Sequence, residues 1–292
     1  ITESSTEDVI NQKIDDKLST MSIEDKVSQM IFAHIINGDV EFSQYDLGGI
    51  ILFADAFEGR DSSEIREYIN NYQSDANIPM LVGIDEEGGT VVRVSKFTAY
   101  RDSRFLSPQE LYKQGGMKAI SSDTIEKSKF LLDLGINVNL APVCDVSTNS
   151  SDFINARAFG QDGTATAEYV DTVVSNMKNS KIGSTLKHFP GYGNNVDTHT
   201  GIAIDNRPYD TFVVDDFLPF KAGIAAGADS ILVSHNIVNS IEEGVPASIS
   251  YNAHNILSED LGFSGVIMTD DMGMDAMLEY GSEEDTAVLA VE

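Results

Sequence analysis

The sequence predicts an α/β fold, a (β/α)8 barrel of the TIM type, on two observations. First, seven short apolar runs of strand length alternate with longer segments of helical character, with no break in composition along the chain. The runs are nearly continuous, as is typical of parallel strands that are buried on both faces. Second, polar side chains gather at the carboxyl ends of these runs, where barrel enzymes place their chemistry. The residues concerned are Asp85, Asp145, Lys187, His188, His235 and Asp270.

A doubly wound open sheet is the alternative architecture. Nucleotide-binding proteins of that kind carry a glycine-rich fingerprint between a strand and the following helix. The segment Gly191-Tyr192-Gly193 lacks the third glycine of this fingerprint, and the pattern GxxxxGK[ST] occurs nowhere in the chain. The barrel is therefore the preferred prediction.

The first half of the chain contains three predicted strands and the start of a helical segment. Ser22 and Asp25 form a capping box before an amphipathic stretch. The third strand ends directly in Glu86-Glu87-Gly88-Gly89, so that acidic groups gather at this strand end. The strands are expected over residues 29–34, 47–53 and 79–85, and a polar-faced helix over 64–73.

The second half of the chain contains four more predicted strands. Ser107 and Glu110 form a second capping box with Pro108 at the first helical position. An eighth strand is needed to close a barrel, but no apolar run after Asp270 provides one, so we expect it to lie outside these residues. The strands are expected over residues 137–146, 182–186, 230–235 and 265–270, and helices over 122–134, 165–179, 217–226 and 283–291.

Composition limits the class of protein. The formal charge of −28 and the pI near 4.3 argue against a nucleic-acid partner, because such a chain cannot neutralise phosphates. Cys144 is the only cysteine, so no disulfide can close within the chain. No apolar run approaches the roughly 18 residues of a membrane span. Residues 1–20 are expected to be a polar tether and 21–292 the catalytic domain. The polar start after Ile1 resembles a tether left by a removed leader, which favours an exported or cell-surface protein.

The densest chemistry lies in residues 187–201, KHFPGYGNNVDTHTG. These fifteen residues contain an ammonium group, two imidazoles and a carboxylate, and their glycines and proline exclude regular structure. Asp197 stands two residues before His199, a spacing at which one side chain can orient the other. A buried core histidine is the structural alternative, but the polar and glycine-rich flanks of His199 disfavour it.

Four motifs together resemble the signatures of family 3 glycoside hydrolases, in their order and approximate spacing. The Asp-Thr-His motif resembles the β-N-acetylglucosaminidase branch of that family, in which the acid/base lies on this barrel loop instead of on a second domain. The resemblance extends over residues 22–292. The motifs are DEEGG at 85–89, KHFPG at 187–191, DTH at 197–199 and TDDMGM at 269–274.

The resemblance implies hydrolysis of terminal β-linked N-acetylglucosamine, from peptidoglycan fragments or chitin-derived sugars. Asp270 would then be the nucleophile, His199 the general acid/base and Asp197 the group that orients it. The resemblance assigns the binding of sugar hydroxyls to Asp85, Arg157, Lys187 and His188, and it implies no cofactor or metal. Structural roles remain the alternatives, namely a strand-end turn for Asp270 and ion pairing for Arg157 and His188. We expect Glu87 to support the loop at Gly88-Gly89 rather than to contact sugar.

This chain also departs from the family pattern. Tyr192 stands where the family usually has histidine, and the segment between Gly193 and Asp197 is one residue short. Thr90 replaces an expected arginine after the double glycine, although Arg93 matches a second one. These changes leave the loop geometry and the leaving-group preference open.

Other functions remain possible on the sequence alone. A β-glucosidase-type or phosphorolytic member of the same family would share the nucleophile, and a non-catalytic sugar-binding protein would keep only the binding residues. A metal-dependent barrel hydrolase would use His188, His199, His235 and Asp270, but the His-x-His pair expected at an early strand end is absent.

Overall fold

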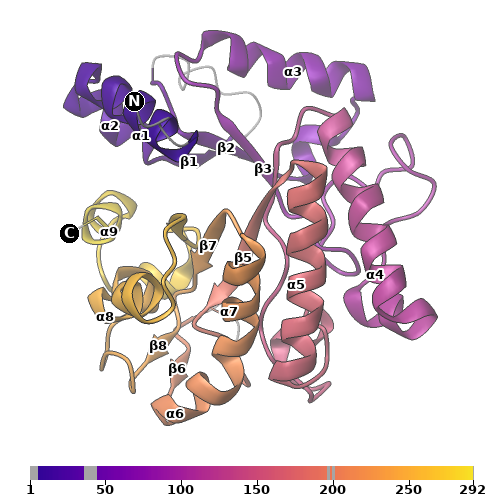
Figure 1. The fold of residues 1–292 in the computed structure, drawn as a ribbon, viewed down its shortest axis with the longest axis vertical. Helices are drawn as coiled ribbons and strands as arrows, with labels where there is room; N and C mark the ends of the chain where they lie inside the picture. The colour runs from indigo at the N-terminus through magenta and orange to yellow at the C-terminus, as the bar shows by residue number, and fades with distance from the viewer. Residues whose placement is uncertain (1–5, 36–44, 196–197, 199–200, 292) are drawn as a thin grey trace, which may run out of the picture.

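The protein is described by a computed structural model that covers residues 6–35, 45–195, 198 and 201–291. Seven parallel strands form one curled sheet in which the order of the strands follows the sequence, β1-β2-β3-β4-β5-β7-β9 (Figure 1). The helices α3, α4, α5 and α7 lie outside this sheet. The architecture confirms the predicted TIM-type α/β fold, built from seven of its eight strands.

The strands are short, and every pair of neighbours in the main sheet runs parallel. A second, two-stranded sheet of β6 and β8 was not predicted, because each of its strands has only two residues. The bounds are Phe32–His34 for β1, Gly49–Leu52 for β2, Leu81–Ile84 for β3, Val138–Asn139 for β4, Gly183–Phe189 for β5, Ile204–Asp205 for β6, Ser230–Val233 for β7, Ile237–Val238 for β8 and Val266–Thr269 for β9.

Helices α2 and α4 begin where the capping boxes predict. Both capping boxes form, at Ser22 and at Ser107, and Ser107 is followed by Pro108 at the start of α4. Helix α4 is longer than expected because it continues through a kink at Gly115 and Gly116. The bounds are Thr6–Thr20 for α1, Ile23–Gln29 for α2, Ser62–Asp75 for α3, Pro108–Asp133 for α4, Gly163–Ser180 for α5, Tyr209–Thr211 for α6, Phe217–Ala226 for α7, Tyr251–Asn255 for α8 and Glu283–Leu289 for α9.

Six of the seven predicted strands are shorter in the structure, and the first and the fourth lose half of their length or more. The first loses its start to α2, which extends to Gln29. The fourth has regular pairing only at Val138–Asn139, since Pro142 has no backbone N–H to donate to a ladder. The chain nevertheless stays beside β5, because the Cys144 N–H donates to the Lys187 carbonyl.

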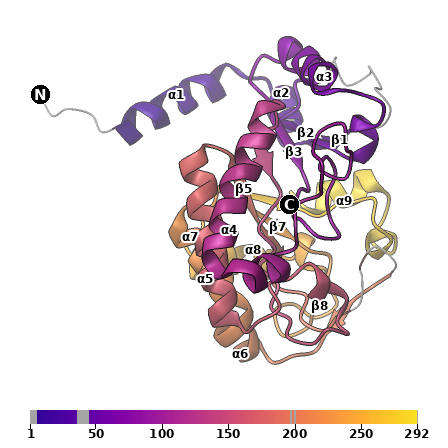
Figure 2. The ribbon, with the colours of Figure 1, turned by 90° about the vertical axis from the view of Figure 1, so that its right-hand side faces the viewer.

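The N-terminal stretch expected to be a polar tether contains helix α1. Its described side chains, from residue 8 to residue 20, are all exposed. Figure 2 shows α1 extending away from the rest of the chain. Within the described residues, no helix is long and apolar enough to cross a membrane.

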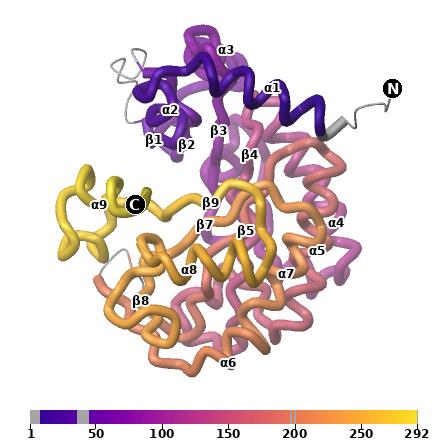
Figure 3. The backbone as a smooth tube through the Cα atoms, turned by 60° about the vertical axis from the view of Figure 1, so that its left-hand side comes forward, coloured from indigo at the N-terminus to yellow at the C-terminus, as the bar shows by residue number. Residues whose placement is uncertain are grey.

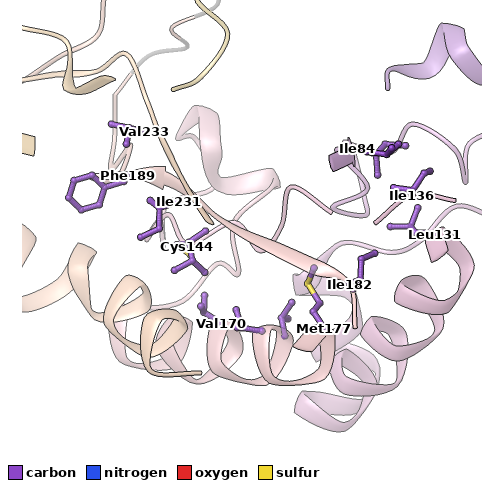
Figure 4. Close-up of a cluster of buried hydrophobic side chains, with 14 of the residues drawn as sticks. Ile84, Leu131, Ile136, Cys144, Val170, Met177, Ile182, Phe189, Ile231 and Val233 are labelled. Carbon is purple, nitrogen blue, oxygen red and sulfur yellow. The ribbon is translucent and has the colours of Figure 1, made fainter. Parts of the chain in front are cut away.

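The core between the sheet and its outer helices places β5 firmly. Val170 and Val174 of α5 face Leu186 of β5, and all three side chains are fully buried. Gly223 lets α7 approach this strand, because a β-carbon at that position would lie 2.6 Å from the Leu186 side chain. Figure 4 shows Ile182, Ile231 and Cys144 in the same layer. The strand whose end carries the densest chemistry is therefore packed closely against its outer helices.

The main sheet has two open edges. Strands β1 and β9 are its first and last members, and they do not pair with each other in the described part of the chain (Figure 3). Val266 of β9 is 51% exposed, unlike the fully buried Ile231 on the neighbouring β7. As expected, no eighth strand joins this sheet within the described residues.

An open edge should be visible in hydrogen exchange. In a parallel strand, successive N–H groups point alternately to the two neighbours. The amides of Val266 and Asp270 donate to carbonyls of the β7 side, whereas those of Ile267 and Thr269 point to the open edge. We expect the second pair to exchange much faster than the first in the 292-residue chain. Mass spectrometry or NMR with single-residue resolution measures this, and equal protection of all four amides would contradict an open edge at β9.

Candidate active site

A buried cluster of ion pairs joins the carboxyl ends of β3 and β5. The Lys187 Nζ lies 2.7 Å from Asp85 Oδ1 and 2.7 Å from Glu87 Oε1. Lys187 is only 2% exposed. Burial alone would lower the pKa of the Lys187 ammonium, but the carboxylates of Asp85 and Glu87 raise it above its ordinary value. The lysine is thus held as a cation at the strand ends.

Glu87 lies at the centre of this cluster. Its carboxylate accepts hydrogen bonds from Arg157 Nε at 3.0 Å and from Arg157 Nη2 at 2.7 Å, a two-point pairing that suits the planar guanidinium. Burial would raise the pKa of Glu87, but Arg157 and Lys187 hold it well below its usual range. Glu87 therefore bridges two of the residues expected to bind sugar, a role that the sequence did not reveal.

Asp85 is paired on two sides. Beside its contact with Lys187, its Oδ2 lies 3.3 Å from the Arg93 Nη2. Burial would raise the pKa of Asp85, but Lys187 keeps it below its ordinary value. The carboxylate is therefore an anion that can accept hydrogen bonds from a ligand hydroxyl group.

The ring of His188 is oriented from both nitrogens. Its Nδ1 lies 2.7 Å from Asp145 Oδ2, and its Nε2 lies 3.1 Å from Arg157 Nη2. Because a guanidinium can only donate, Nε2 is the acceptor, and Nδ1 carries the hydrogen donated to Asp145. The structure thus brings four expected binding residues, Asp85, Arg157, Lys187 and His188, into one connected cluster.

Asp270 follows β9, the last strand of the sheet, and lies at the same carboxyl end of the strands as this cluster. Its N–H donates to the Val233 carbonyl, and its Oδ1 accepts the Asp271 N–H at 2.9 Å. Burial raises the pKa of Tyr192, and the negative charge of Asp270 raises it further. The side chain of Asp270 is partly exposed, as a group that meets a substrate must be.

The other two expected catalytic residues, Asp197 and His199, lie outside the described residues. The described segment before them rests on a second ion cluster. Arg207 Nη1 lies 2.9 Å from Asp216 Oδ2, and Arg207 Nε donates to Asp205 Oδ2 at 2.8 Å. Gly193 has a φ of +55°, and a β-carbon there would lie 2.6 Å from the guanidinium of Arg207. The start of the loop is therefore packed directly onto a partly buried arginine.

Two of the candidate metal ligands, His188 and His235, have other partners. His235 Nδ1 lies 2.7 Å from Ser248 Oγ, and its Nε2 lies 2.9 Å from the Asp271 carbonyl. Across the ranges that the structure describes, no group of three or more His, Cys, Asp or Glu side chains could hold a metal ion.

Sequence reasoning missed the groups that orient the site. The sequence showed Asp145 as an acidic residue at a strand end. Its contact with His188, however, depends on how the chain after β4 is placed beside β5. Arg207, Asp205 and Asp216 gave no sequence signal, because their pairing joins residues from a strand and a helix start.

Comparison with known proteins places the chain in a family. Residues 22–292 match the Glycosyl hydrolase family 3 N terminal domain. The chain belongs to glycoside hydrolase family 3, a class of enzymes that cleave glycosidic bonds.

Relatives with established names agree with this class. A beta-hexosaminidase of Xylella fastidiosa (strain M12) is 32% identical over 263 residues, which cover 83% of this chain and 73% of the relative. Beta-hexosaminidase A of Pseudoalteromonas piscicida is 31% identical over 84% of this chain, but only 44% of that protein is covered. The chain thus spans between about half and three quarters of the length of these relatives.

Solved structures show the same fold. A family 3 β-N-acetylglucosaminidase from Paenibacillus sp. str. FPU-7 superposes with a TM-score of 0.85 at 25% identity, covering 93% of this chain and 53% of that one. A β-glucoside phosphorylase, BglX, superposes with a TM-score of 0.83 at 19% identity over 95% of this chain and 50% of that one, a likeness of fold alone.

The buried position of Glu87 leads to a stability prediction. Glu87→Gln removes the charge that Arg157 and Lys187 share, and breaking a buried pair in this way typically costs about 3–5 kcal/mol. Because the folded-state pKa of Glu87 is lowered, its contribution is present above its ordinary pKa of 4.5 and is lost as pH falls. The gap in unfolding free energy between wild type and variant should therefore be large at neutral pH and narrow below 4.5. Urea denaturation at several pH values measures it.

The exposed pair Arg101–Glu126 provides the control. Glu126 is 61% exposed, so Glu126→Gln should cost less than about 1 kcal/mol at any pH. A gap for Glu87→Gln that is equally small, or that does not change with pH, would contradict the role given to Glu87.

Proposed function

We propose that this chain is the catalytic domain of a retaining glycoside hydrolase that removes terminal β-linked N-acetylglucosamine from peptidoglycan fragments or chitooligosaccharides. The observation that carries the proposal is the cluster of Lys187, Asp85, Arg157 and His188 at the strand ends, with Asp270 at the same edge. The beta-hexosaminidase relatives and the β-N-acetylglucosaminidase structure support the choice of sugar.

The cluster suits a sugar ring with several hydroxyl groups. A hydroxyl can donate to the anionic Asp85 and accept from a cation such as Lys187 or Arg157, so each oxygen of the ring can find a charged partner. The ion pairs also hold these side chains in place before the sugar arrives, which reduces the entropy lost on binding. Binding at this edge brings the anomeric carbon towards the partly exposed carboxylate of Asp270.

The chemistry follows in two steps. In the first, an Asp270 oxygen attacks the anomeric carbon while His199 gives a proton to the departing glycosidic oxygen, and a glycosyl ester forms. In the second, His199 takes a proton from water, which attacks the same carbon and releases Asp270. Two displacements at one carbon retain the β-configuration. Asp197 orients the imidazole and stabilises its protonated form.

A phosphorolytic reaction is the second candidate, and the choice of a histidine as acid/base favours it in one respect. A carboxylic acid becomes an anion after it gives up its proton, whereas an imidazolium becomes neutral. A neutral group does not repel phosphate as the acceptor. Measuring product with and without phosphate separates the two reactions.

Removal of the nucleophile gives the most direct test. Asp270→Ala should lose nearly all turnover of a chromogenic N-acetylglucosaminide, while circular dichroism shows an unchanged fold. NMR of the first anomer formed by the wild type should show the β-product. An α-product would rule out Asp270 as nucleophile. The same assay with glucose, xylose and galactose analogues tests the choice of sugar, and a non-catalytic binding protein would turn over none of them.

The role of His199 can be tested through the leaving group. Loss of general acid/base help typically costs about 10²–10⁴ in rate, and it costs least when the leaving group needs no proton. His199→Ala should therefore slow an alkyl or sugar glycoside far more than a dinitrophenyl glycoside. Asp197→Ala should give a milder form of the same pattern, since the ring remains but is no longer oriented.

An equal loss on both substrates would argue that His199 binds sugar instead.

The acids next to the glycine loop are less suited to the role of proton donor. Glu86 is fully buried, and its carboxylate accepts the N–H groups of Arg93 and Val94. Glu87 is paired with Arg157 and Lys187, which disfavour its protonated form. The described acids next to the glycine loop thus leave His199 as the better candidate.

A further inference from the structure

Lys127 of α4 is a buried cation outside the cluster of ion pairs at the strand ends. The residue is 8% exposed. Its Nζ donates to the Glu87 carbonyl at 3.0 Å and lies 3.1 Å from Asp123 Oδ2, one helical turn earlier. The same Nζ lies over the ring of Phe105, 5.0 Å from its centroid. The ammonium group is thus directed at the backbone of the residue that stands at the centre of the cluster.

The backbone of Glu87 is held at both of its polar groups. Its N–H donates to the Val91 carbonyl at 3.0 Å, and its carbonyl accepts the Lys127 ammonium. The next residue, Gly88, has a φ of +103°, which favours glycine, and a β-carbon there would overlap the Leu106 carbonyl. Glu87 therefore enters a turn that lies directly against the chain before α4.

A bend in α4 lets one helix hold this turn at two points. A straight helix rises about 1.5 Å per residue, so Ser107 at its start and Lys127 would lie about 30 Å apart. In the structure, a β-carbon on Gly89 would lie 2.7 Å from the Ser107 β-carbon, only two residues beyond the carbonyl that Lys127 reaches. The bend depends on Gly116, whose φ of +61° favours glycine.

Packing alone does not fix Glu87 on the side of α4. A cavity of about 30 Å³ lies there, and Glu87 and Lys127 line it together with Asn139 and Tyr169. Atoms beside a void lack packing partners in that direction. The hydrogen bond from Lys127 is therefore the described contact that fixes the Glu87 carbonyl on this side.

We propose that Lys127 is a positioning residue for the sugar-binding cluster, which it holds in place through the Glu87 backbone. This inference rests on the proposed function. The Glu87 carboxylate pairs with Arg157 and Lys187, so a shift of its backbone draws the carboxylate away from both cations. A site that is fixed in advance loses less entropy when a ligand binds. Without Lys127, the looser cluster should therefore bind the sugar more weakly.

The first test removes the ammonium group and keeps the length of the side chain. A hydrogen bond to a charged group corresponds to about 10- to 100-fold in an equilibrium, so Lys127→Met should raise KM for a chromogenic N-acetylglucosaminide by that order. The change in kcat should be much smaller, because the loss falls on binding that substrate and transition state share. Calorimetry should show a similar loss of affinity for N-acetylglucosamine. Lys127→Arg keeps a donor cation and should restore most of the affinity.

A combined variant separates positioning from loss of stability. Lys127→Met also leaves Asp123 without its partner, whereas Lys127→Met with Asp123→Leu replaces the pair by apolar side chains, which is often neutral or stabilising. The combined variant should regain thermal stability but keep the raised KM. Ser128→Ala is the matched control, because Ser128 is buried, lines the same cavity and donates within α4 to the Thr124 carbonyl. It should leave KM unchanged.

A second readout needs no substrate. Glu87→Gln is made in the wild type and in the combined variant, and the urea midpoint of unfolding is measured for all four proteins as a double-variant cycle. The Glu87 carboxylate should contribute less to stability once its backbone is no longer fixed. Glu87→Gln should therefore lower the midpoint clearly less in the combined variant than in the wild type.

The outcomes distinguish this inference from the proposed function. An unchanged KM in Lys127→Met, or recovery of KM in the combined variant, would overturn the positioning role and leave the function intact. If Lys127→Met alone does not fold, the combined variant provides both measurements. If the wild type hydrolyses no glycoside, the proposed function fails, and the urea cycle decides the contact by itself: a smaller effect of Glu87→Gln in the combined variant supports it, and equal effects overturn it.

Discussion

The pairing of Lys187 with Asp85 and Glu87 is the interaction on which the rest of the site depends. Placing four charged side chains in a nearly dry environment costs several kcal/mol per ion unless each is paired. Here each ion has at least one partner of opposite charge, and Lys187, Asp85 and Glu87 each have two. The four charged side chains are therefore stable in this position only when all are present, because removing one would leave another buried charge without one of its partners.

The parallel sheet makes this pairing possible. Strands β3 and β5 are not neighbours, since β4 lies between them. A lysine at the end of β5 has a side chain long enough to pass over the end of β4 and reach Asp85. Arg157 enters from the loop that follows β4, so three successive strands contribute to one cluster. An antiparallel arrangement would place every second strand end on the far side of the sheet.

The loop after β5 is held in a different way. Its start packs onto Arg207, whose guanidinium is fixed between Asp205 and Asp216. Further along this loop, the hydroxyl of Tyr192 is hydrogen-bonded to the hydroxyl of Thr198. Asp145 contacts both the Tyr192 backbone and the His188 ring. The ion cluster that would bind sugar and the loop that carries Asp197 and His199 therefore share a buried carboxylate.

The sequence by itself determined the alternation of helices and strands, the parallel α/β class, the capping of α2 and α4, and the gathering of polar residues at strand ends. These features depend on local periodicity, turn chemistry and the burial of both faces of a parallel sheet, which a single chain displays in its order of residues. The early end of β4 depends on how Pro142 packs against its neighbours in the fold. The bend in α4 depends in the same way on Gly115 and Gly116. Only the tertiary structure decided that Glu87 bridges Arg157 and Lys187, and that Arg207 supports Gly193. Such pairings join residues far apart in the chain, and whether a charge is buried and paired depends on the packing around it.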